Sequence, residues 1–219
     1  MIFFKKSIRE SEFVKKDGIG SRKEKAVETK NKIYESAEQL FTKYGFDDVS
    51  VAAIVEMAGV SKGSFYVHFD SKDSLIASLI SDYIDQLDLN YKLYIESFPM
   101  SAKASDILYA LVEKIVDTMT DTIGYDIIKI IYGVQISRTI DTDTISSYNR
   151  DVYKIFNLVI GKGVEQGEFK PDLTIDIITK HCVLALRGLA YEWCIRYPEF
   201  DFKAQAIQHF GILLSGLKS

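Results

Sequence analysis

The chain has 219 residues, of which 47% are hydrophobic, and a formal net charge of −4 at pH 7. This length allows one large domain or two small ones with a packed core, and the three prolines leave long helices mostly uninterrupted. No segment reaches the roughly 18 consecutive apolar residues of a membrane span, and the start is too short for a signal peptide. We therefore expect a soluble, cytoplasmic protein with no membrane partner.

Charge is spread unevenly along the chain. The first 30 residues contain nine basic and five acidic residues, a net charge of +4, and the remainder carries −8. A basic segment on an acidic body is typical of a protein that binds a polyanion at one end. We interpret residues 1–28 as a flexible basic arm.

Both cysteines, Cys182 and Cys194, fall within one predicted helix. Twelve residues apart, they point in different directions and cannot pair while the helix is intact. They form no metal motif, and free cysteines are typical of a reducing compartment. The sequence predicts no metal site and no cofactor.

Residues 29–75 are predicted to form a head of three short helices. The first runs from about Thr29 to Tyr44, because its apolar residues recur on one helical face. Ser50 caps the second helix and Gly59 turns the chain out of it. Ser61 caps the third helix.

Longer apolar-periodic segments follow the head, and glycines or prolines stand at most of the breaks between them. The predicted helices are 71–97, 102–122, 125–139, 144–166, 173–197 and 202–217. No strand pattern of useful length occurs. The fold class is therefore all-α, with about nine helices: a three-helix head followed by a C-terminal bundle in residues 76–219.

Residues 50–69 have the pattern of a helix-turn-helix, in which the second helix enters the DNA major groove. On a helical wheel, Phe65 and Phe69 mark the buried side of this helix, and Gly63 and Val67 lie roughly opposite. We therefore expect double-stranded DNA to be a partner.

Each residue type on the outward surface has a chemical reason to be there. Gly63 allows the helix backbone to approach base edges or a phosphate closely, and Ser64 can donate or accept a hydrogen bond at either. The Tyr66 hydroxyl reaches a phosphate, and Val67 can contact a thymine methyl. Lys62 neutralises a phosphate or reads a guanine. The full predicted DNA-binding set is Ser50, Ser61, Lys62, Gly63, Ser64, Tyr66, Val67, His68 and Lys72.

Two parts of this set also fit a purely structural role. Ser50, Ser61 and Lys72 lie at helix N-termini, whose free N–H groups bind phosphate, but a serine there is also an ordinary helix cap. His68 alone fits a packed histidine better than a base reader.

Short elements of residues 29–79 together form one longer pattern. They are Ile33 with Ala37 and Leu40-Phe41; Tyr44-Gly45-Phe46; Ser50-Val51 with Ile54; Ala58-Gly59-Val60-Ser61-Lys62-Gly63-Ser64-Phe65-Tyr66; His68-Phe69; and Ser71-Lys72-Asp73 with Leu75. This pattern covers about a quarter of the chain. It resembles the DNA-binding head of the tetracycline-repressor-like (TetR) family of bacterial transcription regulators.

The resemblance implies a two-part, all-α homodimer. In this family the recognition-helix positions that match Lys62, Gly63, Ser64, Tyr66 and His68 lie at the DNA, and the lysine that matches Lys72 contacts phosphate. The C-terminal bundle forms the dimer and binds a small effector, which changes the separation of the two heads and releases the operator.

Three departures from the family pattern are small. Position 53 is often acidic in the family, where it completes a capping box with position 50, so Ala53 predicts a weaker cap. Position 55 is usually Ala, and Val55 predicts slightly wider spacing of the second and third helices. The arm of 28 residues is longer than is typical.

The last two predicted helices form the dimer face that the resemblance implies. In 173–197, apolar residues make one stripe of Ile175, Ile178, Cys182, Ala185 and Leu189 and a second stripe of Ile177, Leu184, Gly188, Tyr191 and Ile195. Two apolar stripes imply that one side of the helix packs into the bundle and the other packs against another surface. The alternative is that both helices are simply central in a monomer. The predicted interface residues are Ile177, Leu184, Gly188, Tyr191, Phe210 and Leu214.

The effector pocket is predicted from aromatic and cationic residues of the bundle. The candidate lining residues are Tyr109, Tyr132, Arg138, Tyr148, Phe156, His181, Arg187 and Trp193, with Tyr91 beside them. Aromatic residues at helical spacing are usually ordinary core, but such a lining favours an apolar or amphipathic effector. A buried Arg138 or Arg187 would indicate an anionic group on that effector.

We predict a DNA-binding transcriptional regulator, a repressor that a small effector releases from a palindromic operator. The alternative is an architectural or protein-interaction DNA-binding factor with no effector, and a cavity in the bundle distinguishes the two. An enzyme is not indicated, because the three histidines, His68, His181 and His209, are scattered and no nucleophile or metal motif is present.

Overall fold

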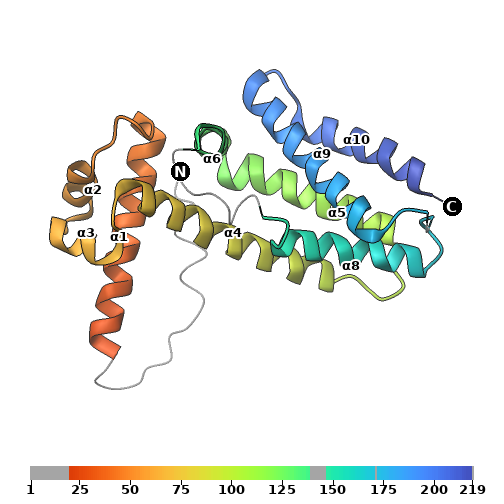
Figure 1. Cartoon of the computed structure of the whole chain (residues 1–219), viewed down its shortest axis with the longest axis horizontal. Coiled ribbons are helices and arrows are strands. Elements are labelled where there is room, and N and C mark those ends of the chain that lie inside the picture. Colours follow the sequence, from red (N-terminus) through yellow and green to blue (C-terminus); the bar gives the residue numbers. More distant parts are fainter. Residues whose placement is uncertain (1–19, 139–146, 171, 219) are drawn as a thin grey trace. The chain divides into compact units, whose positions relative to one another are not determined.

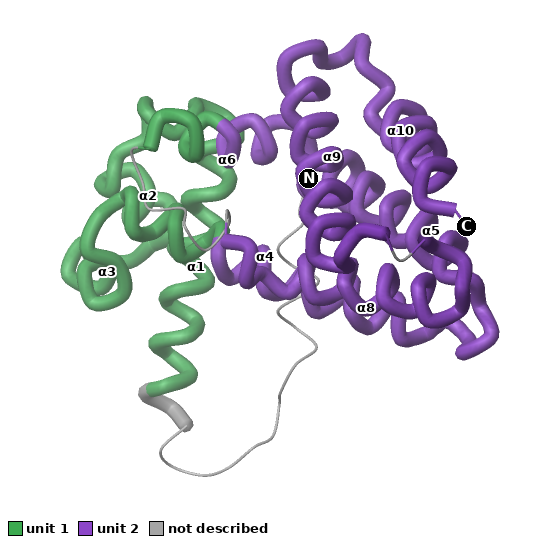
Figure 2. The backbone as a smooth tube through the Cα atoms, turned by 45° about the vertical axis from the view of Figure 1, so that its right-hand side comes forward, with its two compact units in different colours: residues 1–80, 133–140 green, residues 81–132, 141–219 purple. Residues whose placement is uncertain are grey.

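The computed structural model describes residues 20–138, 147–170 and 172–218. The chain divides into two compact units (Figure 2). Unit 1 comprises residues 1–80 with 133–140, and unit 2 comprises residues 81–132 with 141–219.

Helices account for most of the described residues (Figure 1). The elements are α1 Gly20–Tyr44, α2 Val51–Ala58, α3 Lys62–His68, α4 Lys72–Glu96, α5 Ala104–Asp117, the π-helical turn η1 Thr118–Ile123, α6 Tyr125–Ser137, α8 Asp151–Glu165, α9 Ile175–Arg196 and α10 Phe202–Leu217. Within the described ranges there is no sheet, only an isolated antiparallel bridge between Phe169 and Lys218. The all-α prediction is confirmed.

Unit 1 is built on the packing of α1 against α2 and α3. Ile33 and Phe41 of α1, Ile54 of α2 and Phe65 of α3 are at most 3% exposed, as is Phe69 just after α3. Burial of side chains of this size stabilises a fold by about 1.5–3 kcal/mol each. The three short helices are therefore held by a common apolar core.

Helix α1 is longer than the sequence pattern predicts. It begins at Gly20 rather than near Thr29, so part of the predicted flexible arm is helical. The side chains of residues 23–28 are exposed, and this stretch is rich in Lys, Glu and Ala, which favour helix without tertiary contacts. The apolar periodicity misses it because its first turns bury nothing; the rest of the predicted arm lies outside the described residues.

Unit 2 is centred on α5, which packs against α8 and α10, while α9 packs against both of those helices. Leu108 and Leu111 of α5, Phe156 of α8, Cys182 of α9 and Phe210 of α10 are completely buried. These four helices therefore share one apolar core.

The predicted helix 102–122 changes its hydrogen-bonding pattern before it ends. The α-helical part stops at Asp117 and continues as η1. The Thr118 hydroxyl donates to the carbonyl oxygen of Lys114 at 2.7 Å, and such a bond competes with the regular helix ladder. Gly124, with φ at 84°, then ends the element.

Helix α8 begins later than predicted, at Asp151 rather than near residue 144. The preceding residue, Arg150, makes no side-chain cap of its own. Instead, the Asp88 carboxylate of α4 accepts a hydrogen bond from the Val152 backbone N–H at 3.2 Å. The start of this helix is therefore set by a residue far away in the sequence.

Two further expectations from the sequence concern the pairing of the cysteines and the presence of a membrane span. Cys182 and Cys194 are both free. No helix in the described part of the chain is both long and apolar enough to cross a membrane.

Candidate nucleic-acid interface

The α2–turn–α3 segment is positioned by local contacts. The Ser50 hydroxyl accepts from the Ala53 N–H at 3.2 Å, and the Ser61 hydroxyl accepts from the Ser64 N–H at 3.0 Å. Caps of this kind contribute about 1 kcal/mol each. Gly59 turns the chain between the two helices with φ at 64°, a left-handed conformation that favours glycine.

Helix α3 has one buried side and one open side. Phe65 is completely buried and Phe69 is 3% exposed, whereas Tyr66 and Val67 are 55% and 79% exposed. Gly63 is also exposed. The predicted division of this helix is confirmed, and the open side presents two large apolar groups that no other part of unit 1 covers.

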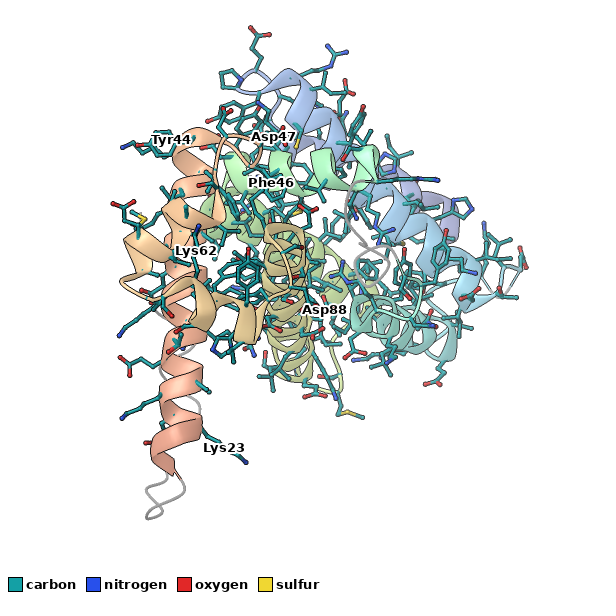
Figure 3. All side chains as sticks on the ribbon, turned by 60° about the vertical axis from the view of Figure 1, so that its left-hand side comes forward. Lys23, Tyr44, Phe46, Asp47, Lys62 and Asp88 are labelled. Atoms are coloured by element: carbon teal, nitrogen blue, oxygen red, sulfur yellow. The ribbon has the colours of Figure 1, made fainter. Side chains whose placement is uncertain are left out.

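The other predicted DNA-binding residues of α3 differ in their exposure and in their contacts within the chain. Lys62 is exposed at the first residue of α3 (Figure 3). The Ser64 hydroxyl lies 2.9 Å from the Ser61 hydroxyl, so the two already share a hydrogen bond. His68 is half-buried, with its ring centroid 6.1 Å from that of Phe69, as a packed histidine would be.

Gly63 is not required by the packing of the chain itself. A Cβ added there would meet only the Ser61 hydroxyl, at 3.7 Å, which is an ordinary contact. Alanine is favoured over glycine inside a helix by about 1 kcal/mol. Packing within the chain therefore gives no reason for a glycine at position 63, and its role at the DNA stays a prediction.

Lys72, the first residue of α4, is engaged within unit 1. Its ammonium donates to the carbonyl oxygens of Phe46 at 2.7 Å and Asp47 at 3.4 Å, and it lies 4.2 Å from the centroid of the Phe46 ring. Phe46 and Asp47 belong to the loop after α1 (Figure 3). An ammonium has three donors, so Lys72 joins α4 to this loop and keeps one donor for the predicted phosphate contact.

Net charge alone does not make the head attractive to DNA. Residues 29–75 contain five lysines and seven acidic residues. At the start of α1, however, Lys23 and Lys25 are exposed, and Lys23 projects from the end of the helix in Figure 3. Attraction to phosphate therefore depends on where the lysines lie.

In unit 2, the two apolar stripes of α9 have different surroundings. Ile178 and Cys182 of the first stripe are at most 2% exposed. The second stripe faces outward: Ile177 is 41% exposed, Leu184 46%, Tyr191 43% and Ile195 59%, and Gly188 is exposed as well. The second stripe is thus an uncovered apolar surface of the single chain, and its role in a dimer stays a prediction.

The predicted interface residues of α10 are wrong. Phe210 is completely buried and Leu214 is 1% exposed, both within the core of unit 2. Helix periodicity puts residues four apart on one face, and Ile212 on nearly the opposite one. Ile212 is 68% exposed and is the large apolar residue that α10 leaves open.

The eight predicted pocket residues do not share one environment. Phe156 and Trp193 are buried, Tyr109, Tyr132 and Arg187 are half-buried, and Arg138, Tyr148 and His181 are exposed. Arg138 falls in unit 1 and not in the bundle, so it does not belong with the others. The Tyr132 hydroxyl donates to the carbonyl oxygen of Arg187 at 3.0 Å, which brings these two together.

Two buried polar groups were missed. Asp88 is 4% exposed and pairs with Arg150; its spacing of four from Ile84 and three from Tyr91 places it on the buried face of α4 and could have indicated this. Tyr153 is 3% exposed, and its hydroxyl has no hydrogen-bond partner. Sequence periodicity predicts the burial of Tyr153 but carries no signal of the missing partner.

Comparison with known proteins finds a family match in unit 1 and more distant likenesses along most of the chain. Residues 33–79 match the family model for bacterial regulatory proteins of the tetR family. The chain is 22% identical over 193 residues to the HTH-type transcriptional repressor KstR2 of Rhodococcus jostii (strain RHA1), with 87% of this chain and 91% of that protein covered. It is 26% identical over 207 residues to the HTH-type transcriptional regulator AcrR of Shigella flexneri, with 88% and 90% covered.

A solved structure extends the likeness to the fold. The transcriptional regulator FadR from Bacillus subtilis, in complex with stearoyl-CoA, matches with a TM-score of 0.71 at 18% identity, over 85% of this chain and 98% of that one. The relatives are named as transcriptional regulators, and the model match falls on the capped helix-turn-helix described above. Residues 33–79 are therefore a DNA-binding domain of the tetR type, and the chain is a DNA-binding transcriptional regulator.

Proposed function

We propose that the protein is a homodimeric repressor that reads a palindromic operator with α3 and leaves it when a small effector binds in unit 2. The observation that carries the DNA-reading part is the open side of α3, where Tyr66 and Val67 are exposed beside Gly63. Large apolar side chains held in water by a firmly capped helix contribute little to folding and are available to a partner. Lys62 adds a phosphate or guanine contact at the same end.

The effector part is supported by the relatives and by the composition of the bundle. KstR2 is named as a repressor, and the FadR structure holds stearoyl-CoA. Unit 2 contains half-buried Tyr109, Tyr132 and Arg187 next to its core. An apolar or amphipathic effector fits these surroundings.

The dimer part is supported by the outer stripe of α9 together with Ile212 of α10. Large apolar groups exposed on neighbouring helices are typical of a surface that is covered by another copy. A dimer would present two α3 helices to two half-sites about one helical turn of DNA apart.

The test begins with DNA fragments selected from genomic DNA by the purified full-length chain, followed by binding measurements using fluorescence anisotropy. We expect Lys62→Ala and Tyr66→Ala each to weaken binding by about tenfold or more, and Lys62→Ala also to reduce the salt dependence. Lys92→Ala, an exposed lysine of unit 2, is the control and should bind normally. Full affinity in both α3 variants would overturn the recognition-helix assignment.

The second candidate, a DNA-binding architectural factor with no effector, makes a different prediction in the same assay. No small molecule that binds unit 2 would then change the affinity for DNA. Release of the selected fragment by a bound small molecule supports the repressor instead.

A further inference from the structure

The Tyr153 hydroxyl is unusual among the buried polar groups. It is the one buried side-chain nitrogen or oxygen without a hydrogen-bond partner in the part of the chain that the structure describes. Two other tyrosines of unit 2 have partners: Tyr125 donates to the Cys194 carbonyl and Tyr132 to that of Arg187. A buried hydroxyl without a partner costs stability, so its retention points to a ligand or an ordered water.

Three basic side chains act on Tyr153. The guanidinium carbon of Arg187 lies 5.7 Å from the centroid of the Tyr153 ring. Burial raises the pKa of Tyr153, and the cations Arg187, Arg150 and Lys180 act in the opposite direction. A guanidinium beside a buried hydroxyl supplies N–H and O–H donors of the kind that bind an oxyanion.

The three cations differ in where they are directed. Arg150 pairs with Asp88 at 2.7 Å, and Lys180 pairs with Asp176 at 2.9 Å. The Arg187 guanidinium lies over the ring that carries the unpaired hydroxyl. Its position over this ring, and not an absence of other contacts, makes Arg187 the cation that would act together with Tyr153.

Neighbouring aromatic groups hold this arrangement in place. The Tyr148 ring meets the Tyr153 ring edge to face, with centroids 5.3 Å apart. The Tyr132 hydroxyl, from α6, binds the backbone carbonyl of Arg187 and so ties α9 at that residue. A ligand would thus meet a preformed group.

The rest of the environment is apolar. Tyr153 belongs to the core cluster of unit 2, with the fully buried Phe156 one turn farther along α8 and Val183 one turn before Arg187 on α9. A fully hydrated ion would not be accommodated among such side chains. These surroundings favour a ligand that is largely apolar and carries its charge at one end.

We propose that the Tyr153 hydroxyl and the Arg187 guanidinium together receive the acidic group, a carboxylate or a phosphate, of an otherwise apolar effector. This inference rests on the proposed function, because it specifies the ligand of the effector site in unit 2. The hydroxyl donates one hydrogen bond to the oxyanion, and the guanidinium supplies charge-assisted bonds.

The experiment uses the full-length protein and three ligands with the same twelve-carbon chain: dodecanoate, dodecyl phosphate and dodecan-1-ol. Calorimetric titration should show at least one of the two acids binding tenfold or more tightly than the alcohol, and whichever acid binds better identifies the group. Tyr153→Phe and Arg187→Gln should each weaken the binding of that acid about tenfold and leave the affinity for the alcohol within about twofold of the wild-type value.

The ligand-free protein provides a second readout. Because Tyr153→Phe removes an unsatisfied hydroxyl, it should raise the Tm by about 2–4 °C. The same substitution should weaken the binding of the acid. Tyr125→Phe is the matched control: it loses a satisfied bond to Cys194, so it should lower the Tm and keep the preference for the acid. Arg196→Gln, an exposed arginine on the same helix, controls for Arg187.

Three results would overturn the inference: no binding of either acid, equal binding of acid and alcohol, or an unchanged acid affinity in Tyr153→Phe. Failure of the proposed function is seen separately in the DNA assay. An acid that binds with the expected preference but does not release DNA supports this inference and contradicts the proposed repressor mechanism. If dodecan-1-ol binds as tightly as the acids and releases DNA, the repressor mechanism is supported and this inference is contradicted.

Discussion

The carboxylate of Asp88 on α4 accepts hydrogen bonds from Nη2 and Nε of Arg150, at 2.7 and 3.2 Å, and from the N–H of Val152 at 3.2 Å. One buried side chain thus neutralises a cation and caps α8. Because all three donors would lose their acceptor or its charge, we expect Asp88→Asn to lower the free energy of unfolding by about 3 kcal/mol. Urea denaturation followed by circular dichroism measures this.

The control is an ion pair of the same helix end that lies in water. Asp151 and Lys154 are more than 60% exposed at their side chains, so Asp151→Asn should cost less than about 1 kcal/mol. Equal effects of the two substitutions would show that the buried Asp88 contacts stabilise unit 2 no more than an exposed ion pair does.

The contrast between α3 and α8 shows what could be predicted from the sequence. The caps of α2 and α3 come from serines three residues before the N–H groups that they accept, so a linear reading identifies them correctly. The cap of α8 comes from Asp88, which no local pattern reveals. Local chemistry was predictable, whereas contacts between distant residues were not.

The α10 error has a related cause. Apolar residues lie on both sides of that helix, and periodicity alone does not say which side faces the core. The structure buries Phe210 and exposes Ile212, because the other helices of unit 2 occupy one side. On α9 the two stripes were separable because polar residues stand between them, although what covers the outer stripe is still a proposal.

Gly63 gives a test in which stability and DNA affinity change in opposite directions. Gly63→Ala meets no clash within the chain, so it should raise the free energy of unfolding by up to about 1 kcal/mol. On the DNA, the added methyl should hold the backbone away and weaken binding by about tenfold. Thermal unfolding and anisotropy on the same preparation measure both.

Gly133, an exposed mid-helix glycine of α6 with nothing near its added Cβ, is the matched control. Gly133→Ala should bring a similar gain in stability with unchanged affinity for DNA. If Gly63→Ala also kept its affinity, close approach of the α3 backbone to DNA would be ruled out.

The outer stripe of α9 should determine the oligomeric state. A charge placed in a covered apolar surface has no partner, so Leu184→Asp should convert the expected dimer into a monomer in sedimentation velocity at micromolar concentration. Leu158→Asp on α8 changes a leucine that is even more exposed, at 60% against 46%, and should leave the dimer intact. A monomeric wild-type protein, or a dimeric Leu184→Asp variant, would contradict the α9 interface.

Glu38 in α1 predicts a pH dependence of the stability of unit 1. Burial, with a further contribution from the neighbouring Glu35, raises the pKa of Glu38 from 4.5 to about 7. Between these two values the folded protein holds a proton that the unfolded chain has released, so the free energy of unfolding falls as the pH rises from 4.5 to 7. Above pH 7 the loss is complete, because both states are then ionised.

Replacing the carboxyl by a neutral amide should remove this loss. At pH 8 we expect Glu38→Gln to be more stable than the wild type by about 1 kcal/mol, a value reduced for partial solvent access, and at pH 4.5 the two should agree. Glu24→Gln, at an exposed position of the same helix, should follow the wild type at both pH values. Parallel curves for Glu38→Gln and the wild type in thermal unfolding between pH 4.5 and 8 would show that Glu38 ionises at its ordinary pKa, and that its place beside Glu35 has no energetic consequence for unit 1.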